Sequence, residues 1–201
     1  MAREHIIGVL SDTHVPHRLL QLPPSVLALL AGSDAILHAG DVEDPYILEP
    51  LRRIAPVYAV RGNVHWQYST GTHDLDLPAA LALPCGDHVI WLTHGHLNFG
   101  YTMFDKVVHI STRPTLAQVN RGVIARLARA KPREADIVVF GHTHKVCGEW
   151  VDGAFYFNPG AVCVESIRGE PPSIGRIVLA ADGAVKPEWI TLDDPACVVG
   201  A

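Results

Sequence analysis

Charged, aromatic and sulfur-containing side chains are all scarce in this chain. Of its 201 residues, 18% are charged and 7% are aromatic, and there are only 2 methionines and 4 cysteines. Hydrophobic residues nevertheless make up 48% of the chain, which excludes a disordered or low-complexity protein. Basic residues are fewer than acidic ones, with 16 Lys and Arg and 21 Asp and Glu, which gives a net charge of -5. This balance argues against duplex nucleic acid as a partner, since neutralising many phosphates requires a basic surface.

The four cysteines are too scattered for a disulfide framework or a Cys-x-x-Cys metal motif. We interpret Cys85, Cys147, Cys163 and Cys197 as small buried side chains in a reducing, cytoplasmic setting. No apolar run reaches about 18 residues, the length that spans a bilayer. The N-terminus leads directly into a predicted strand, without the charged and apolar segments of a leader. We therefore expect no membrane contact, and the length suits a single domain over residues 1–201.

The first third of the chain alternates predicted strands and helices. Short apolar runs at 5–10, 35–38 and 57–60 predict buried strands. Between them, residues 23–30 predict a helix with proline in its first turn, and residues 46–54 predict a second helix. This alternation is typical of a parallel sheet in an α/β fold.

The rest of the chain is richer in strands. An amphipathic helix is predicted at about 115–130, where apolar residues recur at spacings of three and four. Asp152-Gly153 and Asp182-Gly183 predict hairpin turns. Further strands are expected at 89–92, 137–140, 150–151, 154–157, 174–179 and 185–190.

Histidine is abundant, with 12 in the chain, and several histidines belong to polar motifs at predicted strand ends. In open α/β sheets, ligands bind beyond the carboxyl ends of the strands. Asp, His and Asn are the ligand types of a hard-to-borderline divalent metal. The sequence therefore predicts that five distant segments converge on a metal site. These segments are Asp12-Thr13-His14, Gly40-Asp41, Gly62-Asn63, His94-Gly95-His96 and Gly141-His142-Thr143-His144.

The number of candidate ligands indicates two metal ions. One tetrahedral site takes only about three or four protein ligands, whereas two ions about 3.5–4 Å apart can share a carboxylate and use more. A lone Gly-Asp or Gly-Asn is usually just a turn, but five such motifs in order, each at a strand end, are hard to reach by chance. The candidate metal ligands are Asp12, His14, Asp41, Asn63, His94, His142 and His144.

This ordered set of motifs resembles that of the calcineurin-like metallophosphoesterases. Ser11-Asp12-Thr13-His14, Gly141-His142-Thr143-His144 and Asn158-Pro159-Gly160 are similar to the small prokaryotic phosphodiesterase branch of that family. The resemblance covers roughly residues 5–192. It implies an α/β fold with four layers, an αββα sandwich in which two mixed β-sheets pack face to face with helices outside.

The resemblance also implies a role for each ligand. One metal would be held by Asp12, His14, Asp41 and His144, and the other by Asp41, Asn63, His94 and His142, so that Asp41 bridges. The cofactors would be two divalent transition metal ions, with manganese expected first and iron, zinc or nickel as alternatives. A metal-bridging hydroxide would attack phosphorus, and Asn63 would help to position the phosphoryl oxygens.

The third motif departs from the family pattern. Many relatives read Gly-Asn-His-Asp or Gly-Asn-His-Glu, and that histidine stabilises the phosphoryl group or protonates the leaving group. Here Val64 follows Asn63, and His65 takes the place of the acid. Because valine cannot transfer a proton, His65 and His96 are the candidate catalytic replacements. The alternative for each is a histidine that only hydrogen-bonds to metal ligands.

Two further residues are expected to support the site without binding metal. His38 precedes Gly40-Asp41 and is interpreted as a packing or hydrogen-bonding residue. Asn158 is expected to support the Gly141–His144 loop.

Three functions compete at this stage. The leading one is a dinuclear metal-dependent phosphodiesterase acting on a small organic phosphodiester. A phosphomonoesterase or a nucleotide pyrophosphatase would use the same metal site. The third is a non-catalytic protein-binding scaffold, since the retromer subunit that shares this fold binds partners, although it has lost several ligand positions that are filled here. We expect a small-molecule phosphate ester as substrate, and the resemblance suggests a homodimer or homotetramer.

Overall fold

The computed structural model describes residues 3–63, 76–97, 100–101, 116–163 and 171–193. Within these ranges the strands form two five-stranded sheets, one with the order β10-β9-β1-β2-β3 and the other with the order β4-β5-β6-β8-β7. Both sheets mix parallel and antiparallel pairs, as the resemblance implied.

The first sheet is built around three parallel strands, β1 (His5–Leu10), β2 (Ala35–His38) and β3 (Val57–Ala59). The connections between them contain α1 (Pro24–Leu30), the 3-10 helix η1 (Pro45–Ile47) and α2 (Leu48–Arg52). The antiparallel strands β9 (Ser173–Leu179) and β10 (Val185–Thr191) complete the sheet beside β1. The predicted helix at 46–54 is therefore a 3-10 turn followed by a short α-helix that ends at Arg52.

The second sheet has a parallel centre and antiparallel edges. Its parallel strands are β5 (His88–Thr93), β6 (Ile137–Val139) and β8 (Ala154–Asn158). The edge strands are β4 (Ala80–Cys85) and β7 (Cys147–Val151). Helix α4 (Leu116–Ala130) lies between β5 and β6 in the chain, close to the predicted bounds. The sequence patterns do not predict β4, which is half-exposed and contains Pro84, a residue that sheets tolerate mainly at edges.

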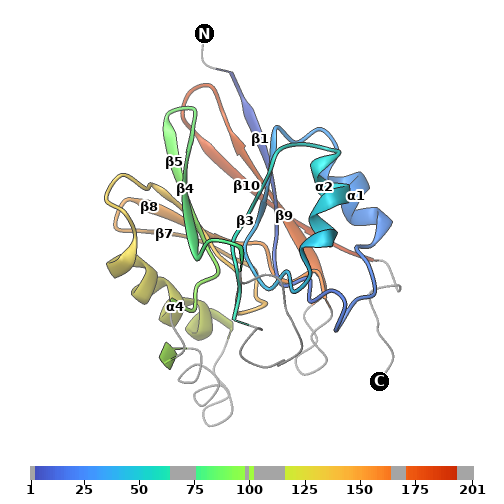
Figure 1. Cartoon of the computed structure of the whole chain (residues 1–201). Coiled ribbons are helices and arrows are strands. Elements are labelled where there is room, and N and C mark those ends of the chain that lie inside the picture. Colours follow the sequence, from blue (N-terminus) through green and yellow to red (C-terminus); the bar gives the residue numbers. More distant parts are fainter. Residues whose placement is uncertain (1–2, 64–75, 98–99, 102–115, 164–170, 194–201) are drawn as a thin grey trace.

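The elements form four layers, with the helices outside the two sheets (Figure 1). Among the described residues, side chains that alternate along the strands fill three hydrophobic cores. Ile7 and Val9 of β1 point between the sheets, where they pack with residues such as Leu92 of β5. Leu10 belongs to the core under α1 and α2. Helix α4 covers the outer face of the second sheet, with Leu127 in the third core. The four-layer αββα sandwich is thereby confirmed.

The two predicted hairpin turns are present. Asp152 and Gly153, with φ of 49° and 76°, join β7 to β8, and consecutive left-handed residues match the twist of a tight hairpin. Asp182-Gly183 lies in the turn between β9 and β10, where the backbone N–H of Ala180 donates to the Ala184 carbonyl. No described helix is both long and apolar enough to cross a membrane.

Candidate metal centre

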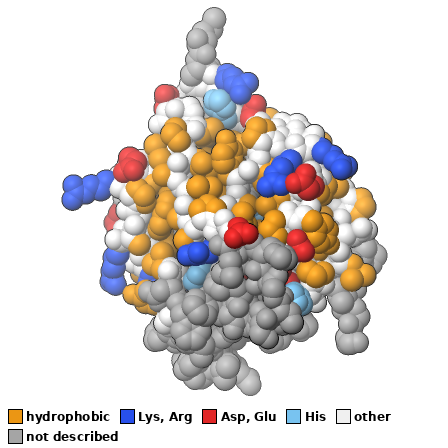
Figure 2. All heavy atoms as spheres, viewed as in Figure 1, with side chains coloured by type: hydrophobic (Ala, Val, Ile, Leu, Met, Phe, Trp, Pro, Cys, Tyr) orange, Lys and Arg blue, Asp and Glu red, His pale blue; other side chains and the backbone are white. Residues whose placement is uncertain are grey.

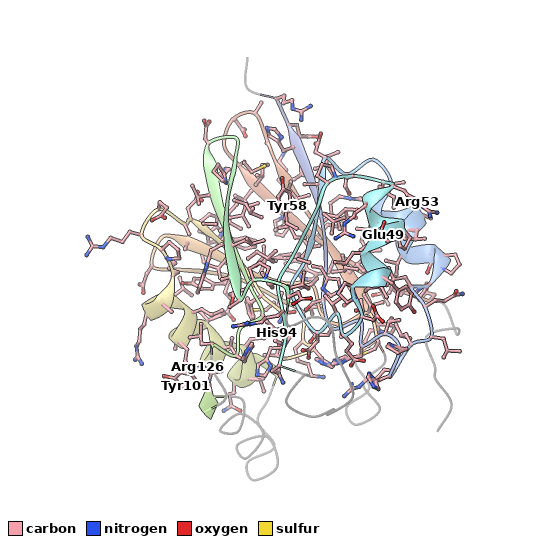
Figure 3. The ribbon with its side chains drawn as sticks, in the orientation of Figure 1. Glu49, Arg53, Tyr58, His94, Tyr101 and Arg126 are labelled. Atoms are coloured by element: carbon pink, nitrogen blue, oxygen red, sulfur yellow. The ribbon has the colours of Figure 1, made fainter. Side chains whose placement is uncertain are left out.

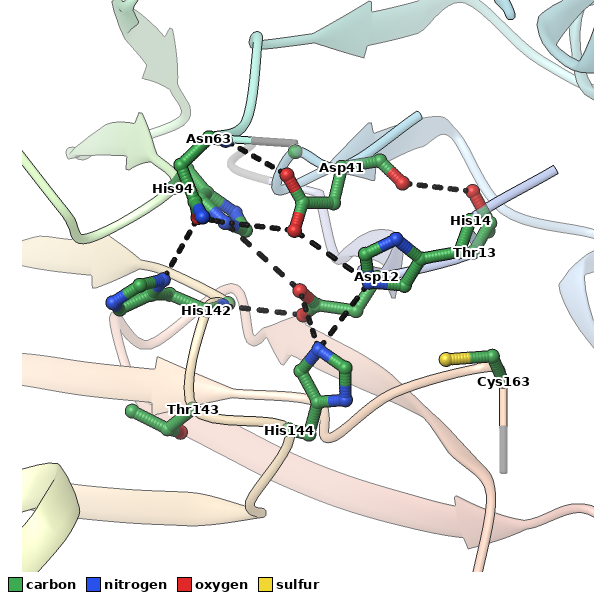
Figure 4. A network of polar contacts seen from close by, with 12 residues as sticks. Asp12, Thr13, His14, Asp41, Asn63, His94, His142, Thr143, His144 and Cys163 are labelled. Atoms are coloured by element: carbon green, nitrogen blue, oxygen red, sulfur yellow. Dashed lines mark hydrogen bonds and ion pairs between the residues drawn. The ribbon is translucent and has the colours of Figure 1, made fainter. Parts of the chain in front are cut away.

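The predicted ligands lie at the carboxyl ends of the parallel strands, where the two sheets meet. Asp12 and His14 follow β1, Asp41 follows β2 and Asn63 follows β3, while His94 follows β5 and the pair His142 and His144 follows β6. In Figure 3, His94 lies below the strands, in the half of the view away from the N-terminus. All seven side chains are drawn together in Figure 4.

Backbone hydrogen bonds hold these strand ends against one another. The N–H of Asp12 donates to the Gly40 carbonyl at 3.0 Å, and the N–H of Gly141 donates to the His94 carbonyl at 3.2 Å. His94 also joins the two sheets, because its Nδ1 lies 2.7 Å from the carbonyl oxygen of Ala39. The positions of the ligands are therefore determined by the sheets themselves.

One group of ligands gathers around the end of β1. Ligand atoms of Asp12, His14, Asp41 and His144 all lie within 4.8 Å of one another. His144 Nε2 is 3.3 Å from Asp12 Oδ1 and 3.4 Å from His14 Nε2. These are the four residues that the resemblance assigned to the first metal.

A second group gathers around Asn63. Its amide oxygen lies 2.9 Å from His94 Nε2 and 2.9 Å from His142 Nδ1. Its backbone N–H donates to Asp41 Oδ1 at 2.8 Å. Direct contacts therefore join the four residues that the resemblance assigned to the second metal, which are Asp41, Asn63, His94 and His142.

Asp41 belongs to both groups. Its Oδ2 lies 3.5 Å from His14 Nε2 on one side and 3.4 Å from His94 Nε2 on the other. The side chain is 5% exposed, so bulk water does not screen it. One carboxylate thus faces a histidine from each group, as a bridging ligand requires.

The carboxylates of the centre are ionised despite their burial. Burial alone would raise the pKa of Asp12, but His144 and His94 outweigh it and lower this pKa to about 2. The pKa of Asp41 lies well below its usual value, because its histidine neighbours outweigh burial in the same way. Conversely, burial would lower the pKa of His94, but Asp41 and Asp12 raise it to about 9. The buried centre therefore holds negative charge that protons or cations neutralise.

Asp12 provides the clearest test of whether this centre fits a metal ion. Its side chain is 0% exposed, and Oδ1 has no hydrogen-bond partner among the described residues. Its polar neighbours are Nε2 of His144 at 3.3 Å and Nε2 of His94 at 4.0 Å. A buried carboxylate oxygen that accepts no hydrogen bond is costly unless a positive charge neutralises it. The donor set of oxygens and imidazoles fits divalent transition metals.

The backbone is unusual at most of the predicted ligands. Asp12, His14, Asp41, His142 and His144 have φ between 50° and 69°, in the left-handed region. Such a conformation costs about 1–2 kcal/mol for a residue other than glycine and is concentrated at functional sites. In an extended chain, the two outer residues of Asp12-x-His14 and of His142-x-His144 would point to the same side. They do converge, but through left-handed turns.

Glu43, which the sequence analysis missed, orients His14. The Glu43 side chain is 1% exposed, and its Oε1 lies 2.8 Å from His14 Nδ1, while its Oε2 contacts the ring of His17. A carboxylate on Nδ1 leaves Nε2 of His14 free to act as a ligand. Its position two residues after Asp41 fits no ligand-spacing rule, so the sequence contained no signal for this role.

His38 is a hydrogen-bonding residue, as expected. The backbone N–H of Gly40 donates to its Nδ1 at 3.3 Å, and its Nε2 lies 3.1 Å from the Thr13 hydroxyl. That hydroxyl donates in turn to the Asp41 carbonyl. Complete burial lowers the pKa of His38 to about 3, so the ring is neutral and its tautomer is set by these bonds. His38 thereby supports the backbone of Asp41.

Asn158 supports the last motif, which confirms the expectation for it. Its side-chain NH2 donates to the Gly141 carbonyl at 2.9 Å and to the Thr143 hydroxyl at 3.0 Å. Thr143 donates further to Asn120 Oδ1 of α4 at 2.8 Å. The loop that carries His142 and His144 is therefore tied to β8 and α4.

The two candidate catalytic histidines differ in how far they can be placed. His96 lies beside the second group, with its ring centroid 5.4 Å from that of His94 and 6.1 Å from that of His142. His65 and Val64 lie outside the described residues. The role of either histidine stays a prediction.

Comparisons with known proteins show the family of this chain. The profile of the calcineurin-like phosphoesterase superfamily domain matches residues 6–181. A probable metallophosphoesterase of Methanothermobacter thermautotrophicus is 30% identical over 193 residues, which is 96% of this chain and 95% of that protein.

Solved structures show the same fold at lower identity. Vps29 of Entamoeba histolytica, crystallised in complex with zinc, has a TM-score of 0.62 and 24% identity, covering 92% of this chain and 98% of that one. A structure described as a novel archaeal phosphodiesterase has a TM-score of 0.57 and 19% identity, covering 92% of this chain and 99% of the other. With the profile match over most of its length, this chain belongs to the calcineurin-like phosphoesterase superfamily.

Proposed function

We propose that the protein is a dinuclear metal-dependent phosphodiesterase that hydrolyses small organic phosphodiesters. The observation that carries the proposal is the position of Asp41 Oδ2, between His14 Nε2 at 3.5 Å and His94 Nε2 at 3.4 Å. A carboxylate so placed can serve two ligand groups at once. When bound, two divalent cations lower the pKa of a water molecule and draw charge from phosphoryl oxygens.

In this proposal the chain positions the reacting groups. The first ligand set consists of Asp12, His14, Asp41 and His144. The second ligand set consists of Asp41, Asn63, His94 and His142. Glu43 and the Ala39 carbonyl contact Nδ1 of His14 and His94, so that each ring presents Nε2 to the centre. Asn63, a member of the second set, would also help to position the phosphoryl oxygens.

The proposed proton donor or phosphate contact is His96. Its ring lies beside His94 and His142, and it follows a ligand by two residues. His65 is the other candidate from the sequence. A general acid contributes about 10²–10⁴-fold to the rate, most for poor leaving groups. Hydrolysis of a substrate with a good leaving group, such as nitrophenolate, therefore measures the activity of the metal centre with little dependence on a general acid.

A small phosphate ester is favoured over a long nucleic acid as substrate. The chain carries a net charge of -5. On the face drawn in Figure 2, basic and acidic side chains are interspersed among apolar ones over the described part of the chain. The archaeal structural neighbour described as a phosphodiesterase supports the choice of a diester. Manganese is the first metal to test, followed by iron, zinc and nickel.

The proposal predicts manganese-dependent cleavage of a diester in preference to a monoester. Chelator-stripped protein, reloaded with Mn²⁺, is assayed on bis-p-nitrophenyl phosphate beside p-nitrophenyl phosphate. Faster release of nitrophenolate from the diester is expected. Preference for the monoester would make the protein a phosphatase. No hydrolysis with Mn²⁺, Fe²⁺, Zn²⁺ or Ni²⁺, in protein that binds these ions, would contradict the enzyme assignment and favour a binding scaffold.

A further inference from the structure

A cysteine lies against the first ligand group. After β8 the chain turns at Pro159-Gly160 and passes along the end of β1, where the backbone N–H of Cys163 donates to the Asp12 carbonyl at 3.3 Å. The preceding N–H, of Val162, donates to the Ser11 carbonyl at 3.1 Å. Cys163 is therefore attached by its backbone to a residue of the metal centre.

The sulfur of Cys163 lies within the same distance limit of the histidines as the predicted ligands do of one another. Ligand atoms of His14, His144 and Cys163 lie within 4.8 Å of one another, the same limit that encloses Asp12, His14, Asp41 and His144. Figure 4 shows the sulfur on the side of His14 and His144, across the cluster from Asn63. Cys163 is 2% exposed, so this position is inside the protein.

A second observation points to a cation at the same place. Asp12 Oδ1, which has no hydrogen-bond partner among the described residues, lies 3.3 Å from His144 Nε2. His144 belongs to both ligand clusters. A cation that neutralises Asp12 would therefore lie beside the histidine that Cys163 also approaches.

We propose that Cys163 supplies a thiolate ligand to the first metal, next to His14 and His144. The proposal rests on the metal-dependent function proposed above and extends its ligand set. On binding, the sulfur–metal bond forms as the S–H bond breaks, and the proton passes to solvent. Because thiolate is a soft donor, the first position selects zinc, iron or cobalt over manganese and magnesium. The second position, with Asn63, His94 and His142, has no such preference.

The competing interpretation is that Cys163 is only a small core residue. It packs with Ala161 and Val162 in the hydrophobic core under α1 and α2. Its sulfur also accepts from Nη1 of Arg18 at 3.8 Å. A purely packing role predicts that the sulfur leaves no signature in the spectrum of a bound metal, which makes the two interpretations separable.

Cobalt spectroscopy provides the test. Chelator-stripped protein is titrated with Co²⁺, and its absorption spectrum is recorded. The proteins compared are the native chain, Cys163→Ser, Cys163→Ala and the control Cys85→Ser. Cys85 is a half-buried cysteine on edge strand β4. We expect a near-ultraviolet thiolate-to-cobalt charge-transfer band in the native chain and in Cys85→Ser. Both Cys163 variants should lack this band while retaining the visible cobalt bands. In both Cys163 variants, the affinity of the first metal position for Zn²⁺ should fall about tenfold or more, and the affinity for Mn²⁺ should be unchanged.

The outcomes separate this inference from the proposed function. A native chain that binds cobalt without a charge-transfer band, or Cys163 variants that retain the band, would overturn the thiolate ligand alone. Absence of the band from the native spectrum decides this even if a variant folds poorly. A native chain that binds no cobalt, manganese or zinc would overturn the metal-dependent function itself.

Discussion

Replacing Asp41 by asparagine is expected to abolish metal-dependent hydrolysis. The exchange preserves size and shape, so Asn63 keeps an oxygen to which its backbone N–H can donate. The negative charge shared by both ligand groups is lost. Changes to residues that only support a ligand cost about 10–100-fold in metal affinity or activity, and we expect the loss of a bridging ligand to exceed that range. The measurement is hydrolysis of bis-p-nitrophenyl phosphate at saturating Mn²⁺.

The matched control for this exchange is Asp182→Asn. Asp182 lies in the exposed turn between β9 and β10, where its side chain accepts from the Ala184 N–H, and asparagine can accept the same bond. Its activity should equal that of the native chain. Near-native hydrolysis in Asp41→Asn, with native circular dichroism, would refute the bridging role of Asp41.

A single methyl group at Gly62 should have the second largest effect. A Cβ at this position would collide with the carboxylate and the backbone nitrogen of Asp41. Either the Asp41 side chain or the strand end that carries Asn63 must then move. Forcing an extra methyl into a packed site costs about 1–3 kcal/mol. For Gly62→Ala we expect this loss in the free energy of unfolding, together with weaker Mn²⁺ binding measured by calorimetric titration.

Gly122→Ala is the control for that prediction. A Cβ on Gly122, which lies in α4, would have no atom within 4 Å. Alanine should stabilise the helix by about 0.5–1 kcal/mol relative to glycine and leave Mn²⁺ binding unchanged. If Gly62→Ala binds Mn²⁺ as tightly as Gly122→Ala does, the close approach of Gly62 to Asp41 is not required for the centre.

Much of the metal centre could be predicted because its residues follow simple strand signals. The apolar run before Asp12 predicts a buried strand, and the rule that ligands bind at carboxyl ends of strands then places Asp12, Asp41 and His94 at one edge. The same reasoning could not assign the strands to two sheets, because hydrophobic runs show burial but not pairing. The resemblance to a known family supplied that step.

Other features had no signal in the sequence. Strand β4 lacks a clean alternation and contains Pro84, so neither periodicity nor composition marks it. Glu43 contacts the centre from a left-handed backbone, as at Asp12 and His14, and Cys163 follows a turn at Gly160, so that both depend on the assembled sheets. The backbone conformation of such short polar segments is determined by tertiary contacts. The position of His65, outside the described residues, stays a prediction.

The central claim, a pair of metal ions bridged by Asp41, is tested most directly by metal stoichiometry. The native chain is stripped with a chelator, reloaded with Mn²⁺ or Zn²⁺, freed of excess metal and submitted to elemental analysis. The account predicts two ions per chain for the better-bound metal, and fewer than two in Asp41→Asn. One ion per chain in the native protein, or two ions in both proteins, would contradict it.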